Sequence, residues 1–193
     1  MTARTHDLAA ITALGALLIV YPANNVTLAT ALVAVLANQI GGIAPDIDQP
    51  TAPFWHNLPS GHFFGRLVGK GLGGHRFITH SIIGVLVMGL LAKLTLQFIH
   101  PLMPHIDITL GWWAFIVGMV SHLVMDTLTK EGVPWLLPIP VKFGFPPVRS
   151  MRITTGKSME KLLFLLLLGL NIWYLASHYT HTVEVVRAVV ARG

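Results

Sequence analysis

The sequence predicts an all-α fold, a helical bundle of about five transmembrane helices in an integral membrane protein. Of its 193 residues, 53% are hydrophobic and 11% are charged, and the mean hydropathy is +0.67. A soluble domain carries roughly a quarter charged residues. Five apolar segments, separated by polar or proline-containing stretches, supply the predicted helices.

The length of the chain favours a single membrane-embedded domain over residues 1–193. The formal charge of +5 comes from basic residues that lie in particular loops and form no continuous stripe. This pattern suits a membrane protein, and no nucleic-acid partner is expected. The chain has no cysteine, so any bound metal must have nitrogen and oxygen ligands, which suit Zn, Mn, Fe, Ni or Mg.

The first two apolar segments are Leu8–Tyr21 and Val26–Ile43. The sequence Pro22–Asn25 between them is typical of a tight turn, so the two helices should form an antiparallel hairpin. The first segment has no clear cleavage site after it and is expected to be retained as a helix. It is short against the roughly 20 residues that span the hydrocarbon, and either inserts partly or is extended by polar flanks.

The remaining apolar segments are Ile78–Ile99, Leu110–Leu128 and Leu162–Ser177. The third and fourth segments are long enough to span, and Pro101 and Pro104 separate them. The fifth is short in the same way as the first. The two long polar stretches, 44–77 and 129–161, are rich in proline or glycine and are predicted to be functional loops.

Histidine and acidic residues gather at the ends of these segments. If the helices alternate in direction, one membrane face receives seven of them: His6, Asp46, Asp48, His75, His80, His122 and Asp126. Ionisable groups at a membrane boundary are costly and indicate a functional site. The sequence therefore predicts a single metal site, for one or two divalent ions with zinc the expected one, at this face.

The same alternation orients the chain. Ten basic residues fall on the predicted site face: Arg4, Arg66, Lys70, Arg76, Lys130, Lys142, Arg149, Arg152, Lys157 and Lys161. The two opposite connections, 22–25 and 100–109, contain neither Lys nor Arg. Lys and Arg collect on the cytoplasmic side of a membrane. The site is therefore expected to face the cytoplasm.

Two pairs of residues have spacings that suit metal ligation. His122 and Asp126 are four residues apart and project from one face of a helix. Asp46 and Asp48 flank one residue, and two carboxylates this close repel each other unless a cation neutralises them. A hydrogen-bonded core histidine and a turn-forming aspartate are the alternatives. Asp46 is the stronger ligand candidate of its pair, and Asp48 or Asp126 could act as the proton acceptor.

His75 and His80 are five residues apart, which fits a loop-borne His75 and a His80 in the first turn of the third helix. Thr79 or Ser81 could cap that helix or orient an imidazole. Arg76 lies between the histidines and could stabilise charge on a phosphate, or equally anchor the helix at the membrane interface. The other histidines are expected to be solvated loop residues: His56, His62, His100, His105, His178 and His181.

The chain matches only part of the signature of the lipid phosphatases that form a phosphohistidine. The matching parts are Pro59–His62 and the His122/Asp126 pair. That family has a Ser-Arg pair where this chain has the apolar Phe115 and Ile116. The upstream Lys and Arg of its signature are missing too.

Several motifs together resemble the YdjM family over roughly residues 6 to 170. They are Leu-Ala-Ala after His6 and the segments 45–50, 74–81, 121–129, 131–138 and 156–160. Members are described as bacterial inner-membrane, metal-dependent hydrolases, some under a name that refers to LexA. The resemblance implies that the seven residues above form the polar core. The family is in turn distantly similar to the all-helical zinc phospholipase C group, whose N-terminal amine ligand is not carried over.

These observations favour a metal-dependent hydrolase of the inner membrane. Its expected substrate is a phosphate ester, lipid or lipid-linked, at the cytoplasmic leaflet, with Asp48, Arg76 and Asp126 as catalytic residues. The alternative is a non-enzymatic metal-ion permease or sensor that uses the same ligands, although few polar residues lie along the helices. A DNA-damage partner protein, suggested only by the family's name, has no support in the residues.

Overall fold

The structure is a computed structural model that describes residues 1–20, 26–52, 55, 58–71, 76–139 and 141–191. Among these residues the fold is all-helical, with two isolated β-bridges and no strand. Five of the described helices are long and apolar enough to cross a membrane, which confirms the prediction: α1 (Ala3–Val20), α2 (Leu28–Ile43) with its extension η1 (Ala44–Asp48), α5 (Ile82–Ile99) with η3 (His100–Leu102), α6 (Ile108–Thr127) and α7 (Ser158–Ser177).

The first and last apolar segments are lengthened by their polar flanks, one of the two predicted alternatives. α1 starts at Ala3 and α7 at Ser158, each a few residues before its apolar run. Both therefore reach spanning length. The predicted turn at 22–25 lies outside the described residues. A final helix, α8 (Tyr179–Ala191), follows α7 at the end of the bundle away from residue 1.

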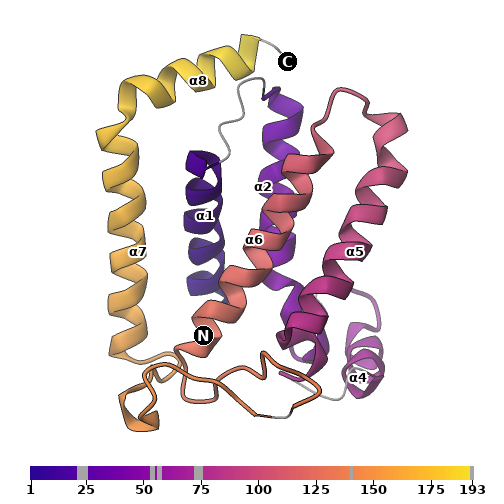
Figure 1. Cartoon of the computed structure of the whole chain (residues 1–193), viewed down its shortest axis with the longest axis vertical. Helices are drawn as coiled ribbons and strands as arrows, with labels where there is room; N and C mark the ends of the chain where they lie inside the picture. The colour runs from indigo at the N-terminus through magenta and orange to yellow at the C-terminus, as the bar shows by residue number, and fades with distance from the viewer. Residues whose placement is uncertain (21–25, 53–54, 56–57, 72–75, 140, 192–193) are drawn as a thin grey trace.

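α6 is the central helix of the bundle and contacts α1, α2 and α5 (Figure 1). Half of its span is buried, against 6% for α7, which packs along α1 at the edge. α2 and α6 approach closely because Gly41 and Gly118 have no side chain at their contact. A Cβ at either position would collide with a backbone carbonyl of the facing helix. The Asn38 amide also donates to the Ala114 carbonyl at 3.1 Å. Helix α6 can therefore present side chains to three other helices at once.

Polar caps define where three helices begin. Thr27 caps α2, Ser81 caps α5 and Asp107 caps α6, each by accepting a backbone N–H of the first turn. Because Ser81 is the cap, α5 starts at Ile82, later than the predicted 78. Residues Ile78–His80 form a separate short 3-10 turn, η2. His80 is thus held just ahead of a helix and not within it.

The prediction of an irregular loop over residues 44–77 is wrong. This stretch contains η1 and the helix α4 (Gly61–Gly71). Glycine is a poor helix former, but Gly61, Gly65 and Gly69 lie on one stripe of α4 that packs against Asp48, Pro50 and Trp55. Tertiary packing outweighs propensity here.

The stretch 129–161 is largely irregular, as predicted, and folds across the end of the bundle (Figure 1). It contains the short η4 (Arg149–Met151) and the first residues of α7. Several contacts attach it to the bundle, two of them through Trp135. The Ile82 N–H donates to the Trp135 carbonyl at 3.0 Å, and the Trp135 indole donates to the Thr127 hydroxyl at 2.9 Å. This stretch lies at the end of the bundle at which the polar residues gather.

Candidate metal centre

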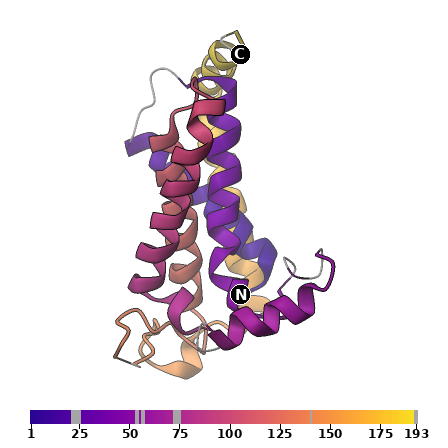
Figure 2. The same ribbon diagram turned by 90° about the vertical axis from the view of Figure 1, so that its right-hand side faces the viewer.

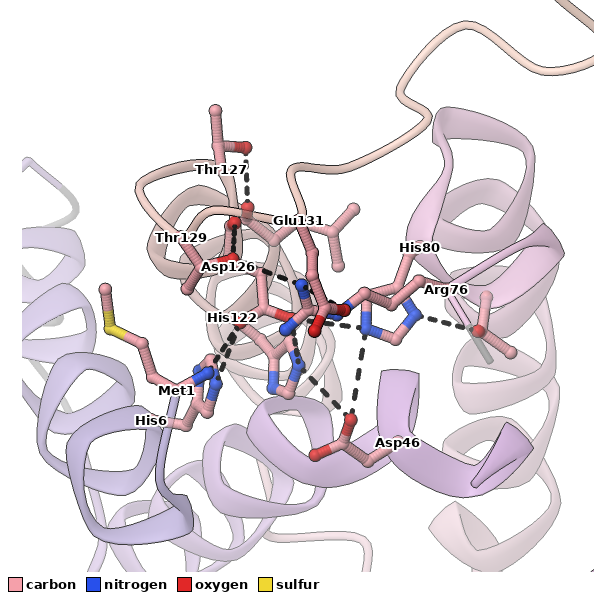
Figure 3. A network of polar contacts seen from close by, with 12 residues as sticks. Met1, His6, Asp46, Arg76, His80, His122, Asp126, Thr127, Thr129 and Glu131 are labelled. Atoms are coloured by element: carbon pink, nitrogen blue, oxygen red, sulfur yellow. Dashed lines mark hydrogen bonds and ion pairs between the residues drawn. The ribbon is translucent and has the colours of Figure 1, made fainter. Parts of the chain in front are cut away.

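Four elements bring polar side chains to one end of the bundle. α1 supplies His6, η1 supplies Asp46 and Asp48, η2 supplies His80, and α6 supplies His122 and Asp126. Five of these side chains point toward one another in Figure 3: His6, Asp46, His80, His122 and Asp126. All are buried except Asp46, whose side chain is 30% exposed. Six of the seven predicted residues therefore converge; the seventh, His75, lies outside the described residues.

His122 has a fixed ring orientation. Its Nδ1 donates to the carbonyl of Gly42 at 2.6 Å, which leaves the lone pair on Nε2. That nitrogen is buried and has no hydrogen-bond partner in the part of the chain described. Two carboxylate oxygens lie near it, Asp46 Oδ1 at 3.7 Å and Asp126 Oδ2 at 3.8 Å. A lone pair facing two carboxylates is unfavourable unless a cation lies between them.

His80 is oriented by a carboxylate on its other side. Asp48 Oδ2 lies 3.5 Å from Nδ1 and accepts a short hydrogen bond from the Thr79 hydroxyl, which itself contacts Nδ1 at 3.0 Å. The predicted roles of Thr79 and Ser81 are thus both found. Burial lowers the pKa of His80, but the carboxylates of Asp126 and Asp48 outweigh it, so the net pKa is raised.

Asp48 occupies a different place from the one predicted for a ligand. It lies on the Nδ1 side of His80, whereas Asp46 and Asp126 lie on the Nε2 side, at 3.9 and 3.6 Å. Its Oδ2 also accepts the Arg76 backbone N–H at 3.0 Å. Such a carboxylate fixes the tautomer and direction of a ligating histidine.

Asp126 contacts several other residues of the cluster. Its Oδ1 lies 3.3 Å from His6 Nε2 and 2.9 Å from the amine of Met1, and its Oδ2 contacts Arg76 at 2.6 Å. The rings of His6 and His122 stack with centroids 3.8 Å apart. The Met1 amine was not carried over in the sequence prediction, yet it lies inside the cluster.

Arg76 points into the site and does not extend toward the membrane surface. It is 7% exposed, and its guanidinium reaches Asp126, Thr129 at 3.1 Å and Glu131 at 3.2 Å. Its backbone has φ of 58°, a conformation that costs a residue other than glycine of order 1 kcal/mol. The guanidinium Nε is buried without a partner among the described residues. These contacts do not fit the interface-anchor alternative for Arg76, and its role toward a phosphate stays a prediction.

Two overlapping groups could hold a divalent ion: His6, His122 and Asp126, and Asp46, His80 and His122. Ligands about 2.0–2.2 Å from one ion lie about 3–4 Å apart. The separations of His122 Nε2 from the two aspartates fall in that range. The nitrogen and oxygen donor set also fits zinc and its neighbours.

Comparison with known proteins gives the chain its family. A family model described as YdjM inner membrane protein matches residues 1–186. The chain belongs to the YdjM family. It is 28% identical to the inner membrane protein YdjM of Escherichia coli (strain K12) over 131 residues, 68% of this chain and 61% of that protein. The inner membrane protein YdjM of Shigella flexneri shows the same identity over the same number of residues.

Another relative covers more of its own length. The uncharacterized protein YvsG of Bacillus subtilis (strain 168) is 25% identical over 162 residues, 84% of this chain and 86% of that protein. No solved structure matches the chain. The comparisons therefore support an inner-membrane family, and the chemistry of the site rests on the geometry above.

Glu160 is a polar residue that the sequence prediction left without a role, although it closes one of the family-like motifs. It is 2% exposed in the first turn of α7. Its Oε1 accepts the Thr2 N–H and the Thr5 hydroxyl at 2.6 and 2.8 Å, and its Oε2 accepts the Gly156 N–H at 2.6 Å. Glu160 thus fastens the start of α1 beside the cluster. A carboxylate in the first turn of an apolar helix is the sequence feature that could have indicated this role.

The other histidines take no part in either candidate metal group among the described residues. His62, His105 and His178 are exposed, which agrees with the predicted solvated positions. His56 lies outside the described residues.

Proposed function

We propose that this YdjM-family protein is a metal-dependent hydrolase that cleaves a phosphate ester of a membrane lipid or lipid-linked compound at the cytoplasmic leaflet. The observation that carries the metal is the lone pair of His122 Nε2, which is buried without a hydrogen-bond partner in the described residues and lies near two carboxylates. A buried acceptor so placed is costly without a cation. Zinc suits the donor set, with two imidazoles and two carboxylates around one position and His6 beside it.

The bound ion would serve as a Lewis acid and activate a water molecule near neutral pH. The residues of the chain supply the other functions. Asp48 holds His80 in its direction through Nδ1. Asp126 ties the ligands to Arg76. Asp46 is the most exposed carboxylate of the cluster. One of its oxygens would hold the metal, and we assign the other to accepting a proton, in place of the predicted Asp48 and Asp126.

Arg76 is the basis for proposing a phosphate ester. Its guanidinium is buried beside the cluster, and its Nε–H points at no acceptor in the described part of the chain. Guanidinium groups fit phosphate oxygens in a planar, forked geometry. The strained backbone at Arg76 is the kind of local cost that is retained at functional sites.

The lipid substrate follows from the position of the cluster. His122 and Asp126 lie in the last turns of a candidate spanning helix, and Asp46 in the last turn of another. A site there meets lipid headgroups first. The cytoplasmic side is proposed from the basic residues of stretches 44–77 and 129–161.

The test is an activity screen on purified protein supplied with Zn²⁺ or Mn²⁺. Phosphatidic acid and a long-chain alkyl phosphate are compared with a short, water-soluble phosphomonoester, and His122→Ala is the matched control. We expect phosphate release from a long-chain substrate that His122→Ala lacks. If the loaded protein instead moves the metal into vesicles and releases no phosphate from any substrate, the permease alternative replaces the hydrolase.

A further inference from the structure

Helix α4 has an unusual division of its surface. Gly61, Gly65 and Gly69 form the buried stripe, and a Cβ added at any of them would meet Asp48, Pro50 or Trp55. At 3.6 residues per turn, the other two thirds of the helix face away from the bundle. The residues that fill these two thirds are of two kinds.

One exposed stripe of α4 is basic or titratable and the other is apolar. The first consists of residues one position after each glycine: His62, Arg66 and Lys70. The second consists of large side chains with exposures of 50 to 67%: Phe63, Phe64 and Leu67. An amphipathic helix with Lys and Arg on one face and Phe and Leu on the other is typical of helices that lie in the membrane interface.

The place of α4 in the bundle matches that composition. It follows η1, the end of a candidate spanning segment, and packs on it. Its axis runs across the long axis of the bundle and not along it (Figure 2). The sequence from residue 49 to residue 106 contains no Asp or Glu. The positive charges of α4 therefore have no acidic neighbour within this stretch of the chain.

We propose that α4 is an interfacial helix that binds an anionic phospholipid surface. Phe63, Phe64 and Leu67 enter the boundary between headgroups and acyl chains. Arg66 and Lys70 contact the phosphates of anionic headgroups. Charge complementarity with anionic lipid and continuity with the apolar surface of the spanning helices decide in favour of lipid over a protein partner.

The glycine stripe couples this surface to the metal centre. Gly69 lies against the carbonyl oxygen of Asp48, closer than a side chain would permit. The carboxylate of the same Asp48 orients His80. The helix that rests on the lipid surface thus contacts the backbone of a residue that positions a candidate ligand. The proposal does not depend on hydrolase activity.

The first test uses the absence of cysteine from the chain. Single variants Phe64→Cys and Lys70→Cys carry a spin label, and Leu86→Cys, at a 67% exposed position on α5, provides the lipid reference. The proteins are reconstituted in vesicles of phosphatidylglycerol and phosphatidylcholine, and label collisions with oxygen and with a water-soluble nickel chelate are compared. We expect the Phe64 label to resemble the Leu86 label and the Lys70 label to be more accessible to nickel.

Two results would overturn the assignment. Nickel accessibility of the Phe64 label equal to that of free label in buffer would place the apolar stripe in water. Strong dipolar broadening between Phe64 labels would show that a second copy of the chain covers it.

The second test measures the charge contribution. The exposed pair Arg66→Gln/Lys70→Gln is compared with Lys142→Gln/Arg149→Gln, an exposed pair of equal charge at the same end of the bundle. Preference for spin-labelled phosphatidylglycerol over phosphatidylcholine is recorded for each. The first pair should lower the preference by about fivefold per charge at low salt. A larger loss in the second pair would move the lipid-binding surface to residues 129–157 and refute the proposal.

Discussion

The two ends of the bundle use similar polar residues for different purposes. At the end away from the cluster, Asp107 caps α6 by accepting the N–H groups of Thr109 and Leu110 at 2.9 and 3.1 Å. The Asp107 N–H donates in turn to the Thr30 hydroxyl at 3.1 Å. These polar atoms close helix ends and are satisfied in doing so.

At the other end, the polar groups exceed what helix capping requires. Asp126 is buried beside His6, His122 and Arg76, and buried nitrogen atoms of these three residues have no hydrogen-bond partner among the described residues. An aspartate at a helix end is therefore not informative by itself. The informative feature is a set of buried donors and acceptors that the protein leaves for a ligand.

The largest expected difference between the ends concerns turnover. Arg76→Lys should keep bound metal yet reduce kcat by about 10²–10³-fold, since Lys cannot reproduce the planar fork. Lys93→Arg is the matched exchange at a distance from the cluster; Lys93 lies over the Trp112 ring at 5.9 Å and should tolerate Arg. Both rates are measured at equal metal occupancy on the substrate the wild type cleaves. Unchanged turnover in Arg76→Lys would remove Arg76 from the mechanism.

Two aspartate-to-asparagine exchanges sharpen the same comparison. Asp48→Asn should weaken metal affinity by about 10–100-fold, because the carboxylate that orients His80 is lost. Asp107→Asn keeps a good helix cap and should leave metal affinity as in the wild type. Titration with a competing chelator measures both. Equal affinities in the two variants would mean that Asp48 does not support a ligand.

A smaller effect should appear in the pH dependence of metal binding. The raised pKa of His80 means that the metal-free fold holds a proton there more tightly than the unfolded chain does. That proton stabilises the metal-free fold below the ordinary pKa of histidine, and its contribution is lost as pH rises through the raised value. A metal requires the neutral ring, so affinity should rise by up to about tenfold per pH unit below the raised pKa and then level off.

One variant can test whether the pH dependence of metal affinity comes from His80. Thr79→Val removes the hydroxyl between Asp48 and His80 and should shift the pH at which affinity levels off. His105→Ala, at an exposed position, should not. A wild-type affinity that is flat from pH 5 to 8 would exclude His80 as a titrating ligand.

The sequence predicted the spanning helices and the convergence of polar residues because both follow from hydrophobicity and alternating topology. His6 and His122 are far apart in the chain, but their positions on antiparallel helices determine which end they share. The sequence did not predict helix α4, because glycines spaced four residues apart favour a helix only when a neighbouring surface packs against them. The place of Asp48 behind His80 depends on the short turns η1 and η2, whose geometry no periodic pattern encodes. The same holds for Arg76, whose inward direction follows from a backbone angle that its sequence neighbours do not indicate.

The metal content of purified protein tests the central claim most directly. Wild type, His122→Ala and His105→Ala are purified without chelator, checked for equal helicity, and analysed by mass spectrometry for bound metal. Asp46→Asn repeats the test at a position whose side chain is 30% exposed, where folding is least at risk. Wild type and His105→Ala should carry at least one equivalent of a divalent metal that His122→Ala and Asp46→Asn lose or hold weakly. Equal metal content in all four proteins would contradict the assignment of the cluster as a metal centre.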